Sequence, residues 1–104
     1  VVFQIKEYLH QNYAVPSLSV PDISEHVRLS PTYVCTLFKN ETGQTLNQYL
    51  TDYRIKMSKQ FLSDPLYKIT DISAKVGYSD GNYYSKAFRK IVGLSPSEYR
   101  EKML

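Results

Sequence analysis

The chain carries nearly the same pattern of residues twice. The first set of positions is Ile23, Ser24, Val27, Ser30, Tyr33, Phe38, Gly43 and Tyr49, and it recurs as Ile72, Ser73, Val76, Ser79, Tyr83, Phe88, Gly93 and Tyr99. The offset is 49 residues up to the second serine and 50 residues after it, so the second copy has gained one residue. An internal repeat constrains a fold more than any single motif, because one structural unit is then built twice.

Apolar spacing and capping residues predict seven helices and no strand. We expect helices over residues 2–13, 20–27, 31–42, 45–62, 69–76, 80–92 and 96–99. Serine or threonine stands before several of these segments, and Ser30-Pro31 and Ser95-Pro96 are strong helix starts because proline needs no N–H partner in the first turn. Gly43 and Gly93 are suited to helix ends.

Apolar residues mark the side of each helix that should be buried. In the long helix 45–62, one stripe is expected to face inward: Leu46, Tyr49, Leu50, Tyr53, Met57, Phe61 and Leu62. In the helix 80–92 the expected buried residues are Tyr84, Ala87, Phe88 and Ile91.

The repeated element reads as a short helix, a tight turn and a second helix, which is the helix-turn-helix arrangement. We predict an all-α fold with two helix-turn-helix subdomains of homeodomain-like type. The first covers residues 1–44, the long helix at 45–63 links them, and the second covers residues 64–104.

Charge is divided unequally between the two halves of the chain. The net charge is +3 overall. Residues 1–50 carry three cations against four carboxylates, a net −1, whereas residues 51–104 carry ten against six, a net +4. A basic half favours a polyanionic partner, although a solvated surface that happens to be basic gives the same imbalance.

Other function classes receive little support. Cys35 is the one cysteine, and His10 and His26 have no partner at metal-ligand spacing. No phosphate-binding loop or nucleophile motif is found, so we predict no cofactor, no metal, no catalytic residue and no enzyme activity.

No apolar run of about 20 residues and no signal peptide is visible, which favours the cytoplasm and no membrane contact. The first residue is Val1, so we expect an upstream segment to be missing.

The second helix of each unit presents polar side chains away from its apolar residues. These exposed sets match through the repeat, and they are Thr32, Cys35, Thr36 and Lys39 in one helix and Asn82, Tyr83, Lys86, Arg89 and Lys90 in the other. Such a helix fits the major groove of duplex DNA, which is about 12 Å wide. Each face singly is also typical of a solvated helix, but two matched faces favour double-stranded DNA.

Individual roles follow from the chemistry of base edges and phosphates. We predict base contacts by Thr32, Cys35, Thr36, Asn82, Tyr83 and Lys86 and phosphate contacts by Lys39, Thr45, Arg89, Lys90 and Ser95. Thr45 and Ser95 stand at helix starts, where we expect free amides to meet backbone phosphate. The linking helix of about 18 residues is about 27 Å long, against about 34 Å for one DNA turn. We therefore expect one chain to place its two reading helices in successive major grooves on one side of the duplex, with the DNA bent if the helix is too short for straight DNA.

The sequence resembles the AraC/XylS-type transcription regulators. The resemblance rests on residues 69–100, ITDISAKVGYSDGNYYSKAFRKIVGLSPSEYR, and on residues 29–43, LSPTYVCTLFKNETG. It implies a seven-helix DNA-binding domain with two helix-turn-helix units, and the family's base-contacting positions correspond to Thr32, Cys35, Thr36, Asn82, Tyr83 and Lys86. The leading hypothesis is therefore a sequence-specific duplex-binding domain that recruits or positions RNA polymerase, most often as an activator. The resemblance also implies an N-terminal sensory or receiver domain, and the wording is most similar to members that belong to two-component response regulators, although sugar-sensing members end similarly.

Two positions depart from that family pattern. Thr36 stands where many members have arginine, which weakens the expectation of guanine reading by the first unit. Arg28 occupies a turn position where glycine is common, so we expect strain there.

Two other functions are alternatives. A related module accompanies DNA-repair alkyl transfer, in which a cysteine accepts the alkyl group, but Cys35 lacks a visible activating partner. A helical protein-interaction domain is the other alternative, and a flat salt response would favour it over duplex binding.

Overall fold

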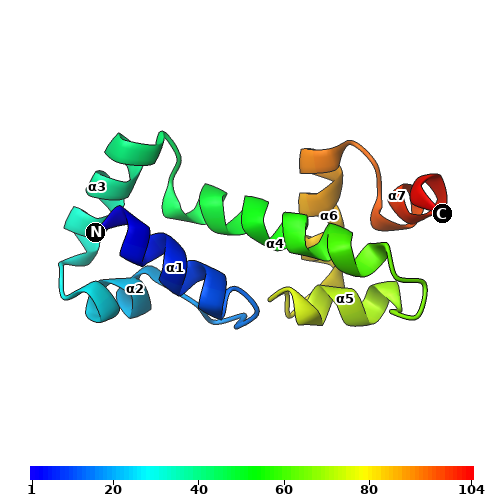
Figure 1. The fold of residues 1–104 in the computed structure, drawn as a ribbon, viewed down its shortest axis with the longest axis horizontal. Coiled ribbons are helices and arrows are strands. Elements are labelled where there is room, and N and C mark those ends of the chain that lie inside the picture. Colours follow the sequence, from blue (N-terminus) through cyan, green and yellow to red (C-terminus); the bar gives the residue numbers. More distant parts are fainter.

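Seven helices and no strand make up the computed structural model, which describes all of residues 1–104 (Figure 1). The helices are α1 (Val2–Asn12), α2 (Val20–Val27), α3 (Pro31–Thr42), α4 (Leu46–Leu62), α5 (Ile69–Lys75), α6 (Gly81–Val92) and α7 (Pro96–Met103). The predicted number and order are confirmed. The last helix continues to Met103, beyond the expected end at Tyr99.

The predicted caps explain where the helices begin. The Ser30 hydroxyl accepts a hydrogen bond from the Tyr33 amide at 3.2 Å, at the start of α3. At α4, the Gln48 amide donates to the Thr45 hydroxyl at 3.1 Å, and the Thr45 amide donates to the Gln48 side chain at 3.0 Å. Such caps satisfy amides that have no partner within the helix, and each contributes about 1 kcal/mol.

The apolar residues form two separate cores, one at each end of an elongated molecule of 43 × 22 × 21 Å. The first core consists of Ile5, Leu9, Ile23, Val34, Phe38, Leu46 and Leu50. The second consists of Ile55, Leu62, Ile72, Val76, Tyr84 and Phe88. In Figure 1, α1–α3 surround one end of α4 and α5–α7 surround the other, so α4 is a wall of both cores.

The buried side of α4 changes along its length, which corrects the expected single stripe. Leu46 and Leu50 face the first core, but the next buried residue is Ile55, followed by Ser58 and Leu62. A step of four residues turns about 40° around a helix, whereas the step of five from Leu50 turns about 140°. The prediction of a single buried face missed Ile55 and Ser58 because it assumed that the whole helix packs against one core.

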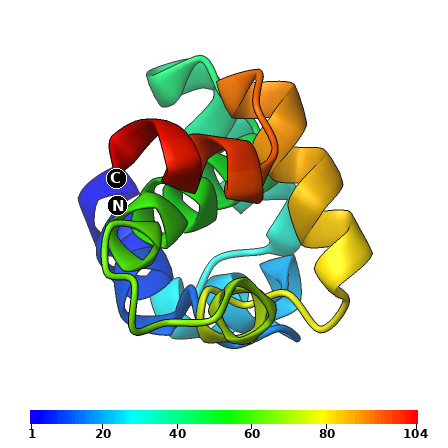
Figure 2. The same cartoon turned by 90° about the vertical axis from the view of Figure 1, so that its right-hand side faces the viewer.

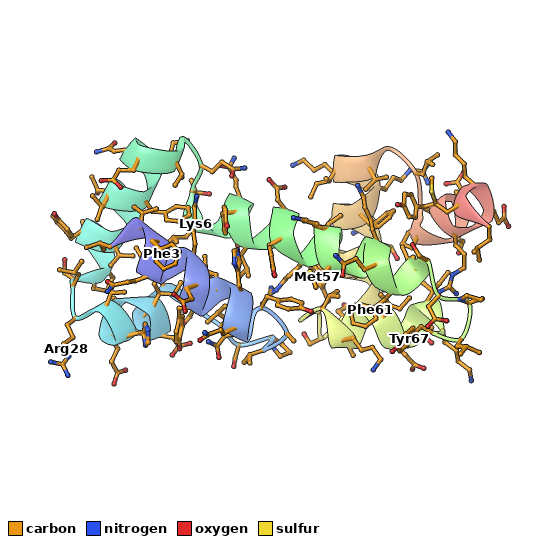
Figure 3. The ribbon with its side chains drawn as sticks, viewed as in Figure 1. Phe3, Lys6, Arg28, Met57, Phe61 and Tyr67 are labelled. Carbon is orange, nitrogen blue, oxygen red and sulfur yellow. The ribbon has the colours of Figure 1, made fainter.

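Several expected core residues are only partly buried. Met57 and Phe61 are half-buried on α4, where they pack against the edge of the second core. Phe61 packs edge-to-face against Tyr67, at 5.1 Å between ring centroids, and the two side chains point toward each other in Figure 3. Ile91 was expected in the core of α6, but 43% of its surface is exposed.

The turn between α2 and α3 contains the predicted strain. Arg28 adopts φ 58°, and it is the one non-glycine residue with positive φ. Its side chain is exposed and extends away from the molecule (Figure 3).

We expect Arg28→Gly to raise the free energy of unfolding by about 0.5–1 kcal/mol, because glycine adopts this conformation without a Cβ clash. Urea unfolding followed by circular dichroism measures the change. Arg28→Ala is the control: it removes the charge and keeps the strain, so a gain equal to that of glycine would contradict this explanation.

Candidate nucleic-acid interface

The two candidate reading helices, α3 and α6, have the same pattern of exposure. Residues 31–43 and 81–93 follow one identical order of exposed, half-buried and buried positions. Every residue predicted to contact DNA is exposed, except Ser95, which is half-buried. The repeat in the sequence is therefore a repeat in space, and it leaves the predicted faces open to solvent.

An equivalent aromatic contact packs each of the two helices, α3 and α6, against the rest of its unit. Phe38 of α3 packs edge-to-face against Tyr49, with centroids 5.4 Å apart and ring planes at 77°. Phe88 of α6 packs against Tyr99 in the same way, at 5.5 Å and 74°. Because Tyr49 and Tyr99 both follow a capped helix start, the capping box also positions the ring that holds the reading helix.

Both helices are presented in a similar orientation. Figures 1 and 2 show α3 and α6 rising in the same direction, across the axis of α4. Their C-terminal ends border one open groove of about 470 Å³, in which Lys39 of α3 and Lys90 of α6 both take part. The groove crosses α4, where Asp52 accepts a hydrogen bond from Gln44 at 2.8 Å. The two lysines therefore lie along one side of the molecule.

The charges on the two faces are unequal, as the sequence indicated. Lys86, Arg89 and Lys90 are all exposed on α6. On α3 the one cation is Lys39, and its ammonium donates to the Gly43 carbonyl at 3.2 Å. The α6 face is therefore the stronger candidate for phosphate.

The helix starts at Thr45 and Ser95 differ from the expectation of free amides. Both amides donate to a side chain: Thr45 to Gln48 at 3.0 Å, and Ser95 to Glu98 at 3.0 Å. The hydrogen bonds from the Ser95 backbone and hydroxyl lower the pKa of the Glu98 carboxyl. A carboxylate at the start of α7 opposes phosphate binding, whereas the neutral Gln48 does not. Contact of either residue with DNA stays a prediction, and the local chemistry favours Thr45.

One exposed residue was missed in the sequence. Tyr33 is 53% exposed on α3, and its counterpart Tyr83 is 68% exposed on α6. The repeat pairs these two tyrosines, so a strict use of that pairing identifies Tyr33 as a candidate contact alongside Tyr83.

No group of three or more His, Cys, Asp and Glu side chains is arranged to hold a metal ion. Cys35 is a free thiol, exposed on α3. None of the helices combines the length and the apolar character that crossing a bilayer requires.

The sequence is similar to a known family profile and to known regulatory proteins. The sequence profile described as a helix-turn-helix domain matches residues 23–102. The Msm operon regulatory protein of Streptococcus mutans is 36% identical over 102 residues, which cover 98% of this chain and 36% of that protein. This chain therefore spans little more than a third of that relative.

Two solved structures have a similar fold. The C-terminal domain of AraT, a response regulator from Geobacillus stearothermophilus, aligns with a TM-score of 0.93 at 29% identity, covering 97% of this chain and 84% of that one. The DNA-binding domain of AdpA, solved in complex with a target DNA, aligns with a TM-score of 0.90 at 18% identity, covering 97% and 90%, and this likeness concerns the fold alone.

The fold and the paired exposed helices define a DNA-binding domain with two helix-turn-helix units. Within that class, the chain belongs to the AraC-type helix-turn-helix family of transcription regulators.

Proposed function

We propose that this chain binds double-stranded DNA sequence-specifically, with α3 and α6 in successive major grooves on one side of the duplex. The observation that carries this proposal is the pair of matched exposed faces whose ends border one groove through Lys39 and Lys90. Subdomains 1–44 and 64–104 each supply one reading helix, and the linker at 45–63 sets the distance between them.

The two helices divide the work of recognition. On α6, Asn82 and Lys86 have side chains that suit adenine and guanine, while Arg89 and Lys90 bind phosphate. On α3, base edges are contacted by single hydrogen bonds or through the thymine methyl group. The side chains are the hydroxyls of Thr32 and Thr36 and the thiol of Cys35. A good bidentate pair contributes about 1–3 kcal/mol of discrimination, so we expect α6 to dominate sequence preference.

The linker length favours bent DNA. The 17 residues of α4 span about 25 Å, which is shorter than the roughly 34 Å between successive major grooves on one side of straight DNA. A bend of the duplex toward the protein brings the two grooves closer, and it costs about 1–6 kcal/mol.

Regulation of transcription requires more than DNA contact. We propose that the chain acts in the cytoplasm, that it positions RNA polymerase and most often activates, and that a sensory or receiver domain controls it. Control by a further domain is supported by the shorter span of this chain relative to the Msm operon regulator and by the likeness to the C-terminal domain of the response regulator AraT. Footprinting and promoter assays with a full-length regulator test these points.

Lys86 and Lys90 separate base reading from phosphate binding. We expect Lys86→Ala to weaken binding to a duplex selected from a random pool by about 1–3 kcal/mol, with little loss on a scrambled duplex, because a base contact is specific. Lys90→Ala should weaken both duplexes equally. Fluorescence anisotropy with the two labelled duplexes measures these losses. If Lys86→Ala also reduced affinity equally for both duplexes, Lys86 would be a phosphate contact instead.

A further inference from the structure

The two units meet at a polar junction halfway along α4. The Arg54 guanidinium donates two hydrogen bonds to the segment that leaves α1: Nε to the Tyr13 carbonyl at 2.9 Å and Nη2 to the Val15 carbonyl at 3.0 Å. The planar fork of arginine fixes two acceptors at once, which a lysine ammonium does not. Arg54 therefore attaches the end of α1, in the first unit, to the middle of the linker.

The same guanidinium also contacts the second unit. Its Cζ lies 5.6 Å from the ring centroid of Tyr78, in the turn between α5 and α6. The preceding residue, Gly77, has φ 96°, and a Cβ added there would collide with the Tyr13 carbonyl oxygen and lie 2.7 Å from Arg54 Nε. The turn approaches this closely because it has no side chain at that position. The Tyr13 carbonyl, the guanidinium and the turn form one packed contact.

Tyr13 connects the two cores as well. Its side chain packs against both hydrophobic clusters and edge-to-face against Tyr53, with 5.2 Å between centroids. Arg54 is half-buried among these rings, so its bond to the Tyr13 carbonyl is partly shielded from water, whereas the bond to Val15 is exposed. Without the guanidinium, the Tyr13 carbonyl would lose its arginine partner, and the Val15 carbonyl would keep the Leu18 amide, which donates to it at 3.2 Å.

We propose that Arg54 is a positioning residue that fixes the orientation of α3 relative to α6, and thereby the spacing of the DNA site. The inference rests on the proposed function for its DNA consequence, but the orientation itself belongs to the free protein. Loss of the junction leaves each core packed on α4 but removes the direct contact between the units, so their relative orientation is held less tightly.

Arg100 offers a matched control within the same chain. It makes the same kind of contact, with Nε donating to the Leu62 carbonyl at 3.1 Å and Nη2 to the Asp64 carbonyl at 3.2 Å. All of these residues belong to the second unit and its shared helix. Arg100→Ala therefore removes two arginine–carbonyl bonds without opening the junction between the units.

The repeat supplies a direct measurement of orientation. Cys35 is the one cysteine, and Ser85 is its exposed counterpart on α6, so Ser85→Cys creates a pair of equivalent labelling sites. Spin labels on both residues report the distance between the helices by double electron–electron resonance, without DNA. We expect a narrow distance distribution in this background, a clear broadening or shift with Arg54→Ala, and no change with Arg100→Ala.

A milder variant protects the test against failure to fold. Arg54→Lys keeps the charge but lacks the planar fork that holds both carbonyls in one fixed geometry, so we expect an intermediate broadening. Circular dichroism confirms that each variant is helical. If folded Arg54→Lys and Arg54→Ala both kept the mean distance and the width of the parent, the proposal would be overturned.

The DNA consequence is measured separately, with a duplex selected from a random pool by the wild-type chain. Inserting one base pair at the centre should weaken wild-type binding about tenfold, because one helix loses its register. Arg54→Ala should show a penalty several-fold smaller, whereas an undiminished penalty would contradict its role in spacing. If selection yields no preferred duplex, the proposed function fails, and the spin-label result still decides the role of Arg54.

Discussion

Phe88→Ala is expected to lower the free energy of unfolding by about 3–5 kcal/mol, because the substitution empties the centre of the second core. Phe88 is fully buried and packs against Tyr84, at 5.9 Å between ring centroids, and against Tyr99 at 5.5 Å. A domain of this size has about 5–15 kcal/mol of stability in total, so the loss brings the second unit close to unfolding. Urea denaturation followed by circular dichroism measures it.

Two further substitutions interpret that result. Phe38→Ala is the counterpart in the first core, where Phe38 is also fully buried, and it should cost a similar amount. Phe3→Ala is the surface control, because Phe3 is 75% exposed and should change stability by less than about 0.5 kcal/mol. If Phe88→Ala cost no more than Phe3→Ala, the second core would not be packed as described.

Binding to random-sequence duplex is expected to weaken about 40-fold between about 50 and 200 mM salt. Three exposed cations predicted to contact phosphate, Lys39, Arg89 and Lys90, lie on the candidate reading helices. Each phosphate neutralised contributes a slope of about −0.9 in log affinity against log salt concentration, so three contacts give about −2.7. The physical cause is the release of counterions from DNA. Fluorescence anisotropy across a salt series measures the slope.

Single substitutions divide this slope among the cations. Lys90→Ala should make it shallower by about one. Lys102→Ala should leave it unchanged, because Lys102 is exposed on α7 rather than on a reading helix. A flat response of the wild-type chain would instead support the helical protein-interaction domain.

The repeat and the caps were sufficient to predict much of the fold. Both are local signals: Ser30, Thr45 and Ser95 act on amides within three residues of themselves, so sequence spacing identifies them. The exposed faces of α3 and α6 could be predicted for the same reason, since helical periodicity separates them from Phe38 and Phe88.

The contacts between the two units could not be predicted in this way. Periodicity assumes that a helix has one buried side, so it could not show that α4 turns from Leu50 to Ile55 toward a different core. Nor does any spacing indicate that Arg54 reaches carbonyls about 40 residues earlier in the chain. These contacts depend on how the finished units pack. At the candidate site, the bonded amides of Thr45 and Ser95 were the main correction.

The change of buried side in α4 has a practical meaning for protein engineering. A chimera that exchanges one DNA-reading half for another should not be joined in the loops at either end of α4, because the half that is separated from α4 would lose a wall of its core. The suitable graft point lies inside the helix, between Leu50 and Ile55. Buried residues of α4 before this point belong to the first core, and those after it belong to the second. Any donor half must also supply a contact for Arg54, which lies at the junction between the two units.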